Sequence, residues 1–160
     1  MHKLVKALPS EADVLQEIAR KSKMYWGYDD EYMKKWKHDQ LLTPSFISHN
    51  PVFALKDGED IVGFFAFDLN FNPIDLKHFW IDPKFTRAGV GKALFSHVFE
   101  FLVSIEFTEF QVTVEPNATG FYTKMGGKVI GEISRPELEQ TYPVMLIQIR
   151  KPNQSNPTDS

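Results

Sequence analysis

The chain contains no cysteine among its 160 residues. This absence excludes disulfide bonds, thiolate metal sites and a cysteine nucleophile. The five histidines, at positions 2, 38, 49, 78 and 97, do not form the His-Glu-x-x-His motif or any other spacing typical of metal ligands. We therefore expect no metal site in this protein.

The chain also lacks any run of lysine or arginine, and its net charge of −3 provides no general attraction for nucleic acid. A secretory leader is not expected, because the apolar run from Leu4 to Leu8 is short and Lys6 interrupts it. We therefore expect a cytoplasmic protein that binds neither nucleic acid nor membrane and that could form a homodimer.

The length of 160 residues, with 42% hydrophobic and 24% charged residues, suits one soluble domain. A domain of this size buries about two-thirds of the surface that its unfolded chain exposes. We place the domain at residues 1–150. Residues 151–160 are rich in proline, asparagine and serine, and we expect them to form a flexible tail.

Apolar periodicity predicts an alternation of helices and strands. Ser10 is expected to cap a first helix, in which Val14, Leu15 and Ile18 fall at helical spacing and face the core. Strands and helices in a mixed order indicate an α+β sheet that is covered on both faces. The expected strands are 3–6, 52–55, 61–69, 74–81, 110–114, 128–133 and 144–150, and the other expected helices are 30–37, a helix after residue 91, and 117–125.

The segment from Ile81 to Lys92 carries the strongest functional signal. It predicts a strand that ends at Ile81, a turn opened by Asp-Pro, and a glycine-containing loop that leads into an amphipathic helix. Because Gly89 and Gly91 lack Cβ atoms, a diphosphate could approach the main chain closely and contact the free N–H groups of the helix start. Arg87 and Lys92 add positive charge. We therefore expect a phosphorylated cofactor at this loop.

Two common nucleotide-binding motifs do not match this loop. The Walker motif requires glycine at position 86 and serine or threonine after the lysine, but the chain has Thr86 and Ala93 there. The dinucleotide fingerprint requires a third glycine at the position of Leu94. The cofactor is therefore expected to bind through a different motif.

The loop resembles the acetyl-CoA loop of the Gcn5-related N-acetyltransferases, which reads Gln/Arg-x-x-Gly-x-Gly/Ala after an apolar strand end followed by x-Pro. Thr86 stands at the Gln/Arg position, with Arg87 beside it. Further along the chain, the stretch from Glu115 to Glu132 resembles the family's second motif, with Phe-Tyr-x-Lys at 121–124 and with Gly127 where phenylalanine is common. The two motifs have the family's order and separation, and the resemblance covers nearly the whole chain.

This resemblance implies an α+β fold with a mixed, mostly antiparallel central sheet of six to seven strands flanked by about four helices. It also implies acetyl-CoA as cosubstrate and direct transfer of the acetyl group to a primary amine of a small molecule or peptide. The cofactor contacts that it implies are Phe79, Ile81, Thr86, Arg87, Ala88, Gly89, Val90, Gly91, Lys92, Asn117 and Lys124.

Acetyl transfer to an amine requires one group that accepts a proton from the amine and another that donates a proton to the leaving thiolate. An amine with a pKa near 10.4 costs about 4–5 kcal/mol to deprotonate at pH 7. The resemblance implies that Tyr122 is the proton donor, although a core tyrosine would show the same pattern. Counting back from Gly89 places Asp75 at the family's base position, and His78 is the alternate base, on the opposite face of the strand by period two.

The aromatic stretch between the first two helices has two interpretations. Tyr25, Trp26 and Tyr28 could line a substrate pocket, or they could pack at a corner between the helices. Three functions also remain open at this point. The chain could be an N-acetyltransferase, a catalytically degenerate CoA-binding regulatory module, or an unrelated α+β interaction domain whose glycine loop only caps a helix.

Overall fold

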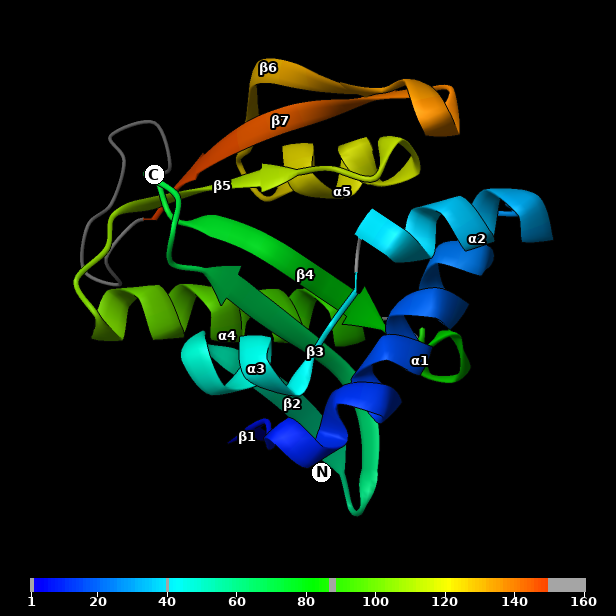
Figure 1. The fold of residues 1–160 in the computed structure, drawn as a ribbon. Coiled ribbons are helices and arrows are strands. Elements are labelled where there is room, and N and C mark those ends of the chain that lie inside the picture. Colours follow the sequence, from blue (N-terminus) through cyan, green and yellow to red (C-terminus); the bar gives the residue numbers. More distant parts are fainter. Residues whose placement is uncertain (1, 40, 87–88, 150–160) are drawn as a thin grey trace.

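The computed structural model describes residues 2–39, 41–86 and 89–149. These residues form a seven-stranded sheet in the order β1-β2-β3-β4-β5-β7-β6 (Figure 1). All neighbouring strands are antiparallel except β4 and β5, which are parallel. The strands are β1 (His2–Lys6), β2 (Val52–Asp57), β3 (Asp60–Asp68), β4 (Asp75–Ile81), β5 (Glu109–Thr113), β6 (Lys128–Arg135) and β7 (Gln140–Gln148).

The predicted fold class, a mixed and mostly antiparallel α+β sheet, is confirmed. The described residues contain five α-helices, where about four were expected. None of the helices in these residues is long and apolar enough to cross a membrane. The helices are α1 (Ala12–Met24), α2 (Asp30–Asp39), α3 (Pro44–His49), α4 (Val90–Ser104) and α5 (Thr119–Lys124).

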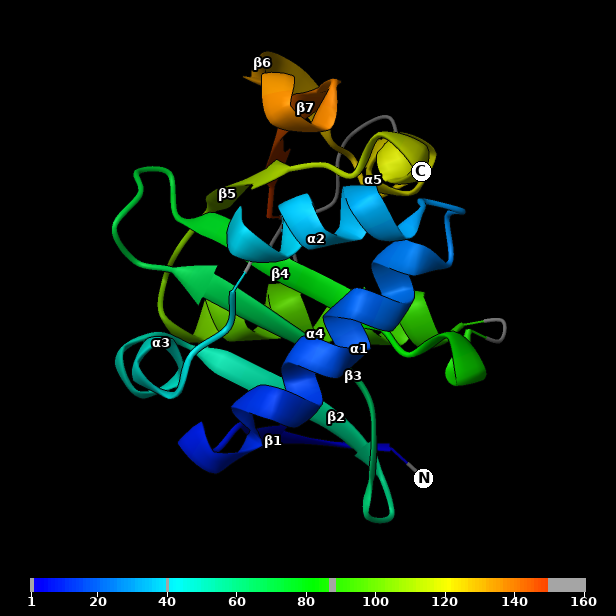
Figure 2. The same ribbon diagram turned by 45° about the vertical axis from the view of Figure 1, so that its right-hand side comes forward.

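Helices cover both faces of the sheet, as the sequence predicted, and Figure 2 shows α1 and α4 on opposite sides of it. Side chains of β3 alternate between the two layers, as a strand with two covered faces requires. Phe64 and Ala66 pack with α1, α2 and α3. Phe65 and Phe67 pack with α4 and with the segment around α5. The sheet therefore separates two hydrophobic cores.

The two parallel strands β4 and β5 open a gap in the middle of the sheet. Within the described residues they pair only at Asp75 and Gln111, where the Gln111 N–H donates to the Ile74 carbonyl at 2.9 Å. On its other edge, β4 stays paired with β3 as far as Ile81. The strands therefore diverge towards their carboxyl ends, as Figure 1 shows, and leave unpaired main chain on either side of the gap.

An irregularity in β4 changes which side chains share a face. The register with β3 shifts between the pairs Ala66–His78 and Phe67–Leu76, so Lys77 is an extra residue. His78 therefore packs on the α1–α3 side, with its ring 5.9 Å from that of Phe64. The prediction that Asp75 and His78 lie on opposite faces was wrong, because period two does not persist across a bulge.

Local details at the first helices also differ from the prediction. Ser10 does not cap α1, because the helix begins after a 3-10 turn at Pro9–Glu11, in which the Glu11 carboxylate accepts the Leu8 N–H at 2.8 Å. Val14 is exposed rather than buried. Helix α3 was not predicted, although Thr43 caps it by accepting the Phe46 N–H at 3.0 Å. Short helices are missed from sequence because six residues show little periodicity.

Candidate active site

A cavity of about 400 Å³ occupies the gap between β4 and β5. Its volume falls within the roughly 300–1,000 Å³ typical of sites for small molecules and cofactors. The lining comes from the end of α1 and the residues after it, from β4, from the segment before α4 and its first turn, and from β5, α5 and the segment between them. The lining residues are Ser22, Tyr25, Trp26, Leu76, Lys77, Phe79, Trp80, Ile81, Pro83, Thr86, Gly91, Val112, Thr113, Glu115, Asn117, Ala118, Phe121 and Tyr122.

The amino end of α4 reaches one end of this cavity. Gly89 caps the helix in the left-handed conformation, with φ of 95°, and Gly91 lines the cavity. A Cβ at Gly91 would lie 3.7 Å from the Phe121 ring, which is ordinary contact, so packing alone does not require glycine there. The first N–H groups of a helix lack partners within the helix, and the helix dipole favours an anion at this end. The geometry suits a diphosphate.

The cofactor residues expected from the sequence divide into three groups. Five of them line the cavity: Phe79, Ile81, Thr86, Gly91 and Asn117. Gly89, Val90 and Lys92 belong to the start of α4 without lining the cavity, and Lys124 lies exposed at the end of α5. Arg87 and Ala88 lie outside the described residues.

Tyr122 lies in the wall of the cavity and is 6% exposed. Its ring packs 5.9 Å from that of Phe95 and 6.4 Å from that of Phe79. Burial raises the pKa of the Tyr122 phenol, so the hydroxyl stays protonated at neutral pH and can act as a proton donor. Gly127 packs directly against this wall. A larger residue would disturb it, because a Cβ there would lie 2.9 Å from the Tyr122 carbonyl oxygen. The absence of phenylalanine at 127 therefore has a local packing reason.

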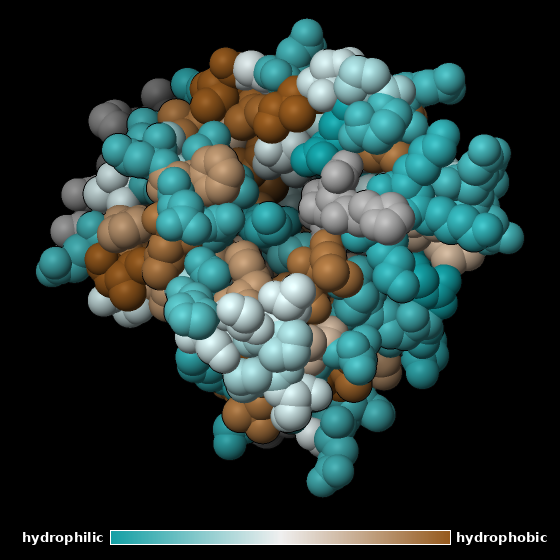
Figure 3. All heavy atoms as spheres, viewed as in Figure 1, coloured by the Kyte–Doolittle hydropathy of each residue, from teal (hydrophilic) through white to brown (hydrophobic). Residues whose placement is uncertain are grey.

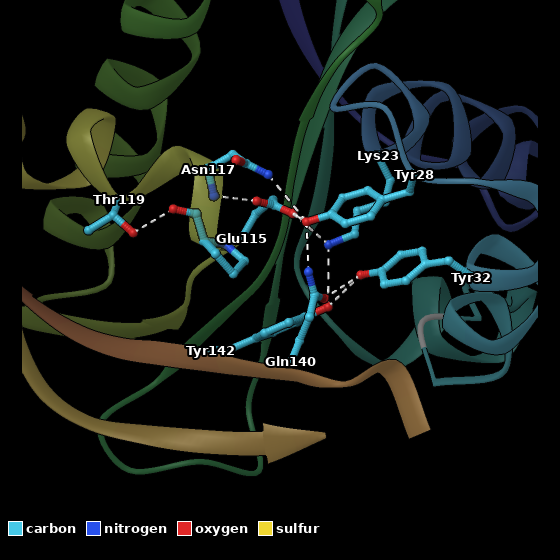
Figure 4. Close-up of polar contacts among 9 residues, drawn as sticks. Lys23, Tyr28, Tyr32, Glu115, Asn117, Thr119, Gln140 and Tyr142 are labelled. Atoms are coloured by element: carbon cyan, nitrogen blue, oxygen red, sulfur yellow. Dashed lines mark hydrogen bonds and ion pairs between the residues drawn. The ribbon is translucent and has the colours of Figure 1, made fainter. Parts of the chain in front are cut away.

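A buried polar network stands beside the cavity (Figure 4). Lys23 is 1% exposed, and its Nζ lies 2.8 Å from Oε1 of Glu115 and 3.3 Å from the Tyr142 hydroxyl. The Tyr28 hydroxyl also donates to Glu115 Oε1, and the Asn117 N–H donates to Oε2. The Lys23 ammonium, the Tyr28 hydroxyl and the Asn117 N–H therefore all converge on the Glu115 carboxylate.

Aromatic rings enclose the Lys23 ammonium. Its Nζ lies 4.7 Å from the centre of the Tyr28 ring, 5.0 Å from that of Tyr142, 5.5 Å from that of Tyr32 and 5.9 Å from that of Trp36. Ring faces attract a cation, and the attraction grows when water is excluded. The network therefore holds the α1–α2 corner against the segment that leads into α5.

We predict that Lys23→Met lowers the free energy of unfolding by about 3 kcal/mol, because the substitution leaves Glu115 buried without its counter-charge. Denaturant unfolding measures the change. Lys21→Met, on an exposed position of the same helix, is the matched control and is expected to stay within about 0.5 kcal/mol of the wild type. Adding Glu115→Gln to Lys23→Met is expected to recover part of the loss, and equal stability of Lys23→Met and wild type would contradict the pairing.

A second cavity, of about 210 Å³, adjoins the first. Its walls include Trp36 and Tyr142, which belong to the core on the α1–α3 side. The two cavities share Leu76, Lys77, Trp80, Thr113 and Glu115, so they meet between β4 and β5. Two reactants could therefore meet where the two cavities join.

The two candidate bases have different environments. Asp75 lines the second cavity, and burial raises the pKa of its carboxyl to about 6, while Lys77 opposes this increase and Asp68 adds to it. His78 lines neither cavity and is 2% exposed. Its Nδ1 accepts the Trp80 indole N–H at 3.0 Å, and burial lowers the pKa of the imidazole to about 3. The position of His78 therefore does not suit it as the alternate base that the sequence analysis named.

The aromatic residues expected to bind substrate are also separated. Tyr25 and Trp26 line the larger cavity at its exposed end, whereas Tyr28 points into the polar network. Sequence reasoning missed Lys23 and Glu115. The spacing Leu15, Ala19, Lys23 places this lysine on the buried face of α1, which was an available signal for Lys23. No local signal identified its partner, 92 positions away.

The described histidines, aspartates and glutamates include no group of three or more that could hold a metal ion.

Comparisons with known proteins agree with the geometry. The sequence pattern of the acetyltransferase (GNAT) domain family matches residues 19–136. Among curated proteins, no sequence matches this chain. Many solved structures share its fold, and three of them, all at low identity, are described in turn. The PaiA N-acetyltransferase of Thermoplasma acidophilum, in complex with coenzyme A, is 18% identical with a TM-score of 0.77, and the alignment covers 92% of this chain and 99% of that one.

The second is the ribosomal-protein-S18-alanine N-acetyltransferase of Escherichia coli, which is 15% identical with a TM-score of 0.67, over 98% of this chain and 100% of that one. The third is a protein of Salmonella typhimurium solved with its cofactor acetyl-CoA, which is 13% identical with a TM-score of 0.63, over 98% and 99% of the two chains. The family match spans the diverging strands and the helix that Gly89 caps, and we conclude that this chain belongs to the GNAT family of acetyltransferases.

Proposed function

We propose that the protein transfers the acetyl group of acetyl-CoA directly to a primary amine of a small molecule or peptide. The observation that carries this proposal is the cavity between β4 and β5, which has the start of α4 at one end and Tyr122 in its wall. Family membership removes the alternative of an unrelated interaction domain. The proposal still competes with a CoA-binding module that has no turnover.

The residues present fit acetyl-CoA. Gly91 leaves the main chain of α4 open to a diphosphate, and Phe79, Ile81 and Phe121 offer apolar walls to the rest of the molecule. Acetyl-CoA supplies an acetyl group activated as a thioester. The chain itself has to bind and orient the two reactants, accept a proton from the amine and return a proton to the sulfur.

Two side chains suit these proton transfers. Tyr122, protonated and in the cavity wall, would donate its proton to the sulfur that leaves as the C–S bond breaks. Asp75 faces the second cavity, from which the amine would approach, and would accept the amine proton directly or through a water as the C–N bond forms. Its raised pKa makes the carboxylate a stronger base than an ordinary aspartate.

The direct test is thiol release from acetyl-CoA with a panel of primary amines, combined with mass analysis of the products. We expect amine-dependent thiol release and an amine heavier by one acetyl group. If acetyl-CoA binds in calorimetry but no amine raises thiol release above hydrolysis, the protein is a CoA-binding module without turnover and the proposal is wrong.

We predict that Asp75→Asn lowers kcat/KM for the amine by about 10- to 100-fold at pH 7 and leaves acetyl-CoA affinity unchanged. The proton-accepting carboxylate is present above about pH 6 and is lost below it, so the wild-type rate falls through that range as pH decreases. The deficit of the variant is expected to shrink at high pH, where more of the amine is already free.

His78→Gln provides the comparison for the pH–rate profile of Asp75→Asn. Because His78 lines neither cavity, we expect this variant to keep the wild-type pH–rate profile. The opposite pattern, with a defect in His78→Gln and none in Asp75→Asn, would transfer the base role to the histidine. Wild-type profiles for both variants would show that solvent or another residue deprotonates the amine.

A further inference from the structure

Trp80 is the largest side chain at the point where the two cavities meet. The residues that line both cavities are Leu76, Lys77, Trp80, Thr113 and Glu115. Figure 3 shows a hollow near the middle of the face that carries β4, β7 and α2, the elements that supply Trp80, Tyr142 and Trp36 to the second cavity. A reactant at this junction therefore lies beside the Trp80 indole.

The indole of Trp80 is held from two sides. Its N–H donates a hydrogen bond to Nδ1 of His78 at 3.0 Å. The ring of Trp36, from α2, meets it edge-on, with 5.7 Å between the ring centres and 89° between the planes. His78 and Trp80 are two apart in β4, beyond the bulge at Lys77, so both side chains lie on the α1–α3 side of the sheet. The hydrogen bond and the ring contact together define the orientation of the indole.

His78 is suited to hold this hydrogen bond. Its side chain is buried, and the rings of Phe64 and Phe46 lie 5.9 Å and 6.2 Å from its own. Burial lowers the pKa of the imidazole to about 3, and the Lys77 charge adds to this decrease, so the ring is neutral at neutral pH. A neutral imidazole that accepts at Nδ1 carries its proton on Nε2, and Nε2 has no hydrogen-bond partner among the described residues. Within this part of the chain, the imidazole therefore serves only the Trp80 N–H.

We propose that His78 is a positioning residue for acetyl transfer, which fixes the Trp80 indole as the wall against which the acceptor amine lies. The inference rests on the proposed function, because it concerns the acceptor at the same site. His78 lines neither cavity, so it acts only through Trp80. An indole that loses the acceptor of its N–H can turn about its side-chain bonds and change the space at the junction. Misplacing a reactant by about 1 Å can cost about 100-fold in rate.

The first test measures kcat/KM for phenethylamine and for the most reactive amine of the panel. We expect His78→Leu, which removes the acceptor, to lower kcat/KM for the amine about 10-fold and to leave acetyl-CoA affinity within about twofold. The deficit is expected to stay constant through neutral and alkaline pH, because His78 is neutral throughout. His78→Asn, whose Oδ1 is as far along the side chain as Nδ1, should recover to within about threefold of the wild type. Equal deficits in both variants would overturn the inference.

Trp80→Phe tests whether His78 acts through the indole. This variant removes the N–H donor and part of the wall, and we expect it to lower kcat/KM for the amine about 10-fold. In that background, His78→Leu should cause less than about twofold further loss, because no indole N–H remains to be held. Losses that multiply in the double variant would contradict the proposal. So would wild-type kcat/KM in Trp80→Phe, an outcome that does not require any His78 variant to fold.

Tyr32→Phe is the matched control for the loss of a partly buried hydrogen bond. Tyr32 lines neither cavity, and its hydroxyl donates to Gln140 at 2.6 Å. We expect kcat/KM for the amine to stay within about twofold of the wild type. Denaturant unfolding of every variant separates a change in stability from a change in kinetics. A loss in Tyr32→Phe as large as that in His78→Leu would show that the effect is not specific to the indole.

An NMR readout separates failure of this inference from failure of the proposed function. The chain has three tryptophans, at positions 26, 36 and 80, and Trp80→Phe identifies the Trp80 indole N–H signal by its disappearance. We expect phenethylamine, added to the CoA-loaded protein, to shift this signal in the wild type but not in His78→Leu.

If amines are acetylated but the kinetic expectations fail, the positioning role is wrong while the proposed function stands. If no amine is acetylated, the proposed function is wrong, and the NMR titration decides the inference by itself. A Trp80 signal that phenethylamine leaves unchanged in the wild type, or shifts equally in His78→Leu, would then overturn it.

Discussion

Gly91→Glu is expected to abolish acetyl-CoA binding in calorimetry while the protein stays folded. Gly91 lines the cavity at the first turn of α4, so a glutamate there places a carboxylate where the diphosphate has to bind. Two anions at one helix terminus repel each other, and the new side chain also blocks the close approach of the ligand to the main chain. The fold is expected to persist because a Cβ at this position makes only ordinary contact, 3.7 Å from Phe121.

Gly91→Ala is the matched control for this effect. Alanine adds the Cβ without the charge, so we expect weakened but measurable affinity, with a melting temperature close to that of the wild type. Gly89 is a less informative position, because its φ of 95° strains any other residue and would disturb the loop itself. Wild-type affinity in a folded Gly91→Glu variant would show that the diphosphate does not bind at this helix.

Tyr122→Phe is expected to lower kcat by about ten- to a thousand-fold with little change in acetyl-CoA affinity. The phenylalanine ring keeps the contacts with Phe95 and Phe79, so the substitution removes only the hydroxyl that would protonate the sulfur. Single-turnover kinetics at saturating acetyl-CoA and amine measures the chemical step without interference from product release.

A matched variant on the polar network separates loss of chemistry from loss of structure. Tyr32→Phe removes a hydroxyl that forms hydrogen bonds with Gln140 and Tyr142. Tyr32 does not line the larger cavity. We expect it to reduce stability by about 1 kcal/mol and to leave kcat nearly unchanged. An unchanged kcat in Tyr122→Phe, when chemistry limits the rate, would reduce Tyr122 to a core residue.

Several parts of the fold and the site could be predicted because they depend on short stretches of chain. The apolar stripe on α4, which includes Leu94 and Val98, follows from helical periodicity alone. The hairpin between β2 and β3 follows from Asp57-Gly58, where Gly58 has a positive φ of 65°. Errors arose where one residue changes the period, as Lys77 does in β4.

By itself, the sequence determined the end of the site that we propose binds the diphosphate. Gly89 can take a left-handed conformation, and the helix that follows has free N–H groups, whatever the rest of the chain does. The tertiary structure alone decided which other residues line the site. The strand order β4-β5-β7 brings Lys23 to Glu115, across 92 positions, and places Asp75 and Lys77 in a cavity with Arg135. Such contacts depend on which strands pair and where they diverge, and local patterns of polarity do not encode either.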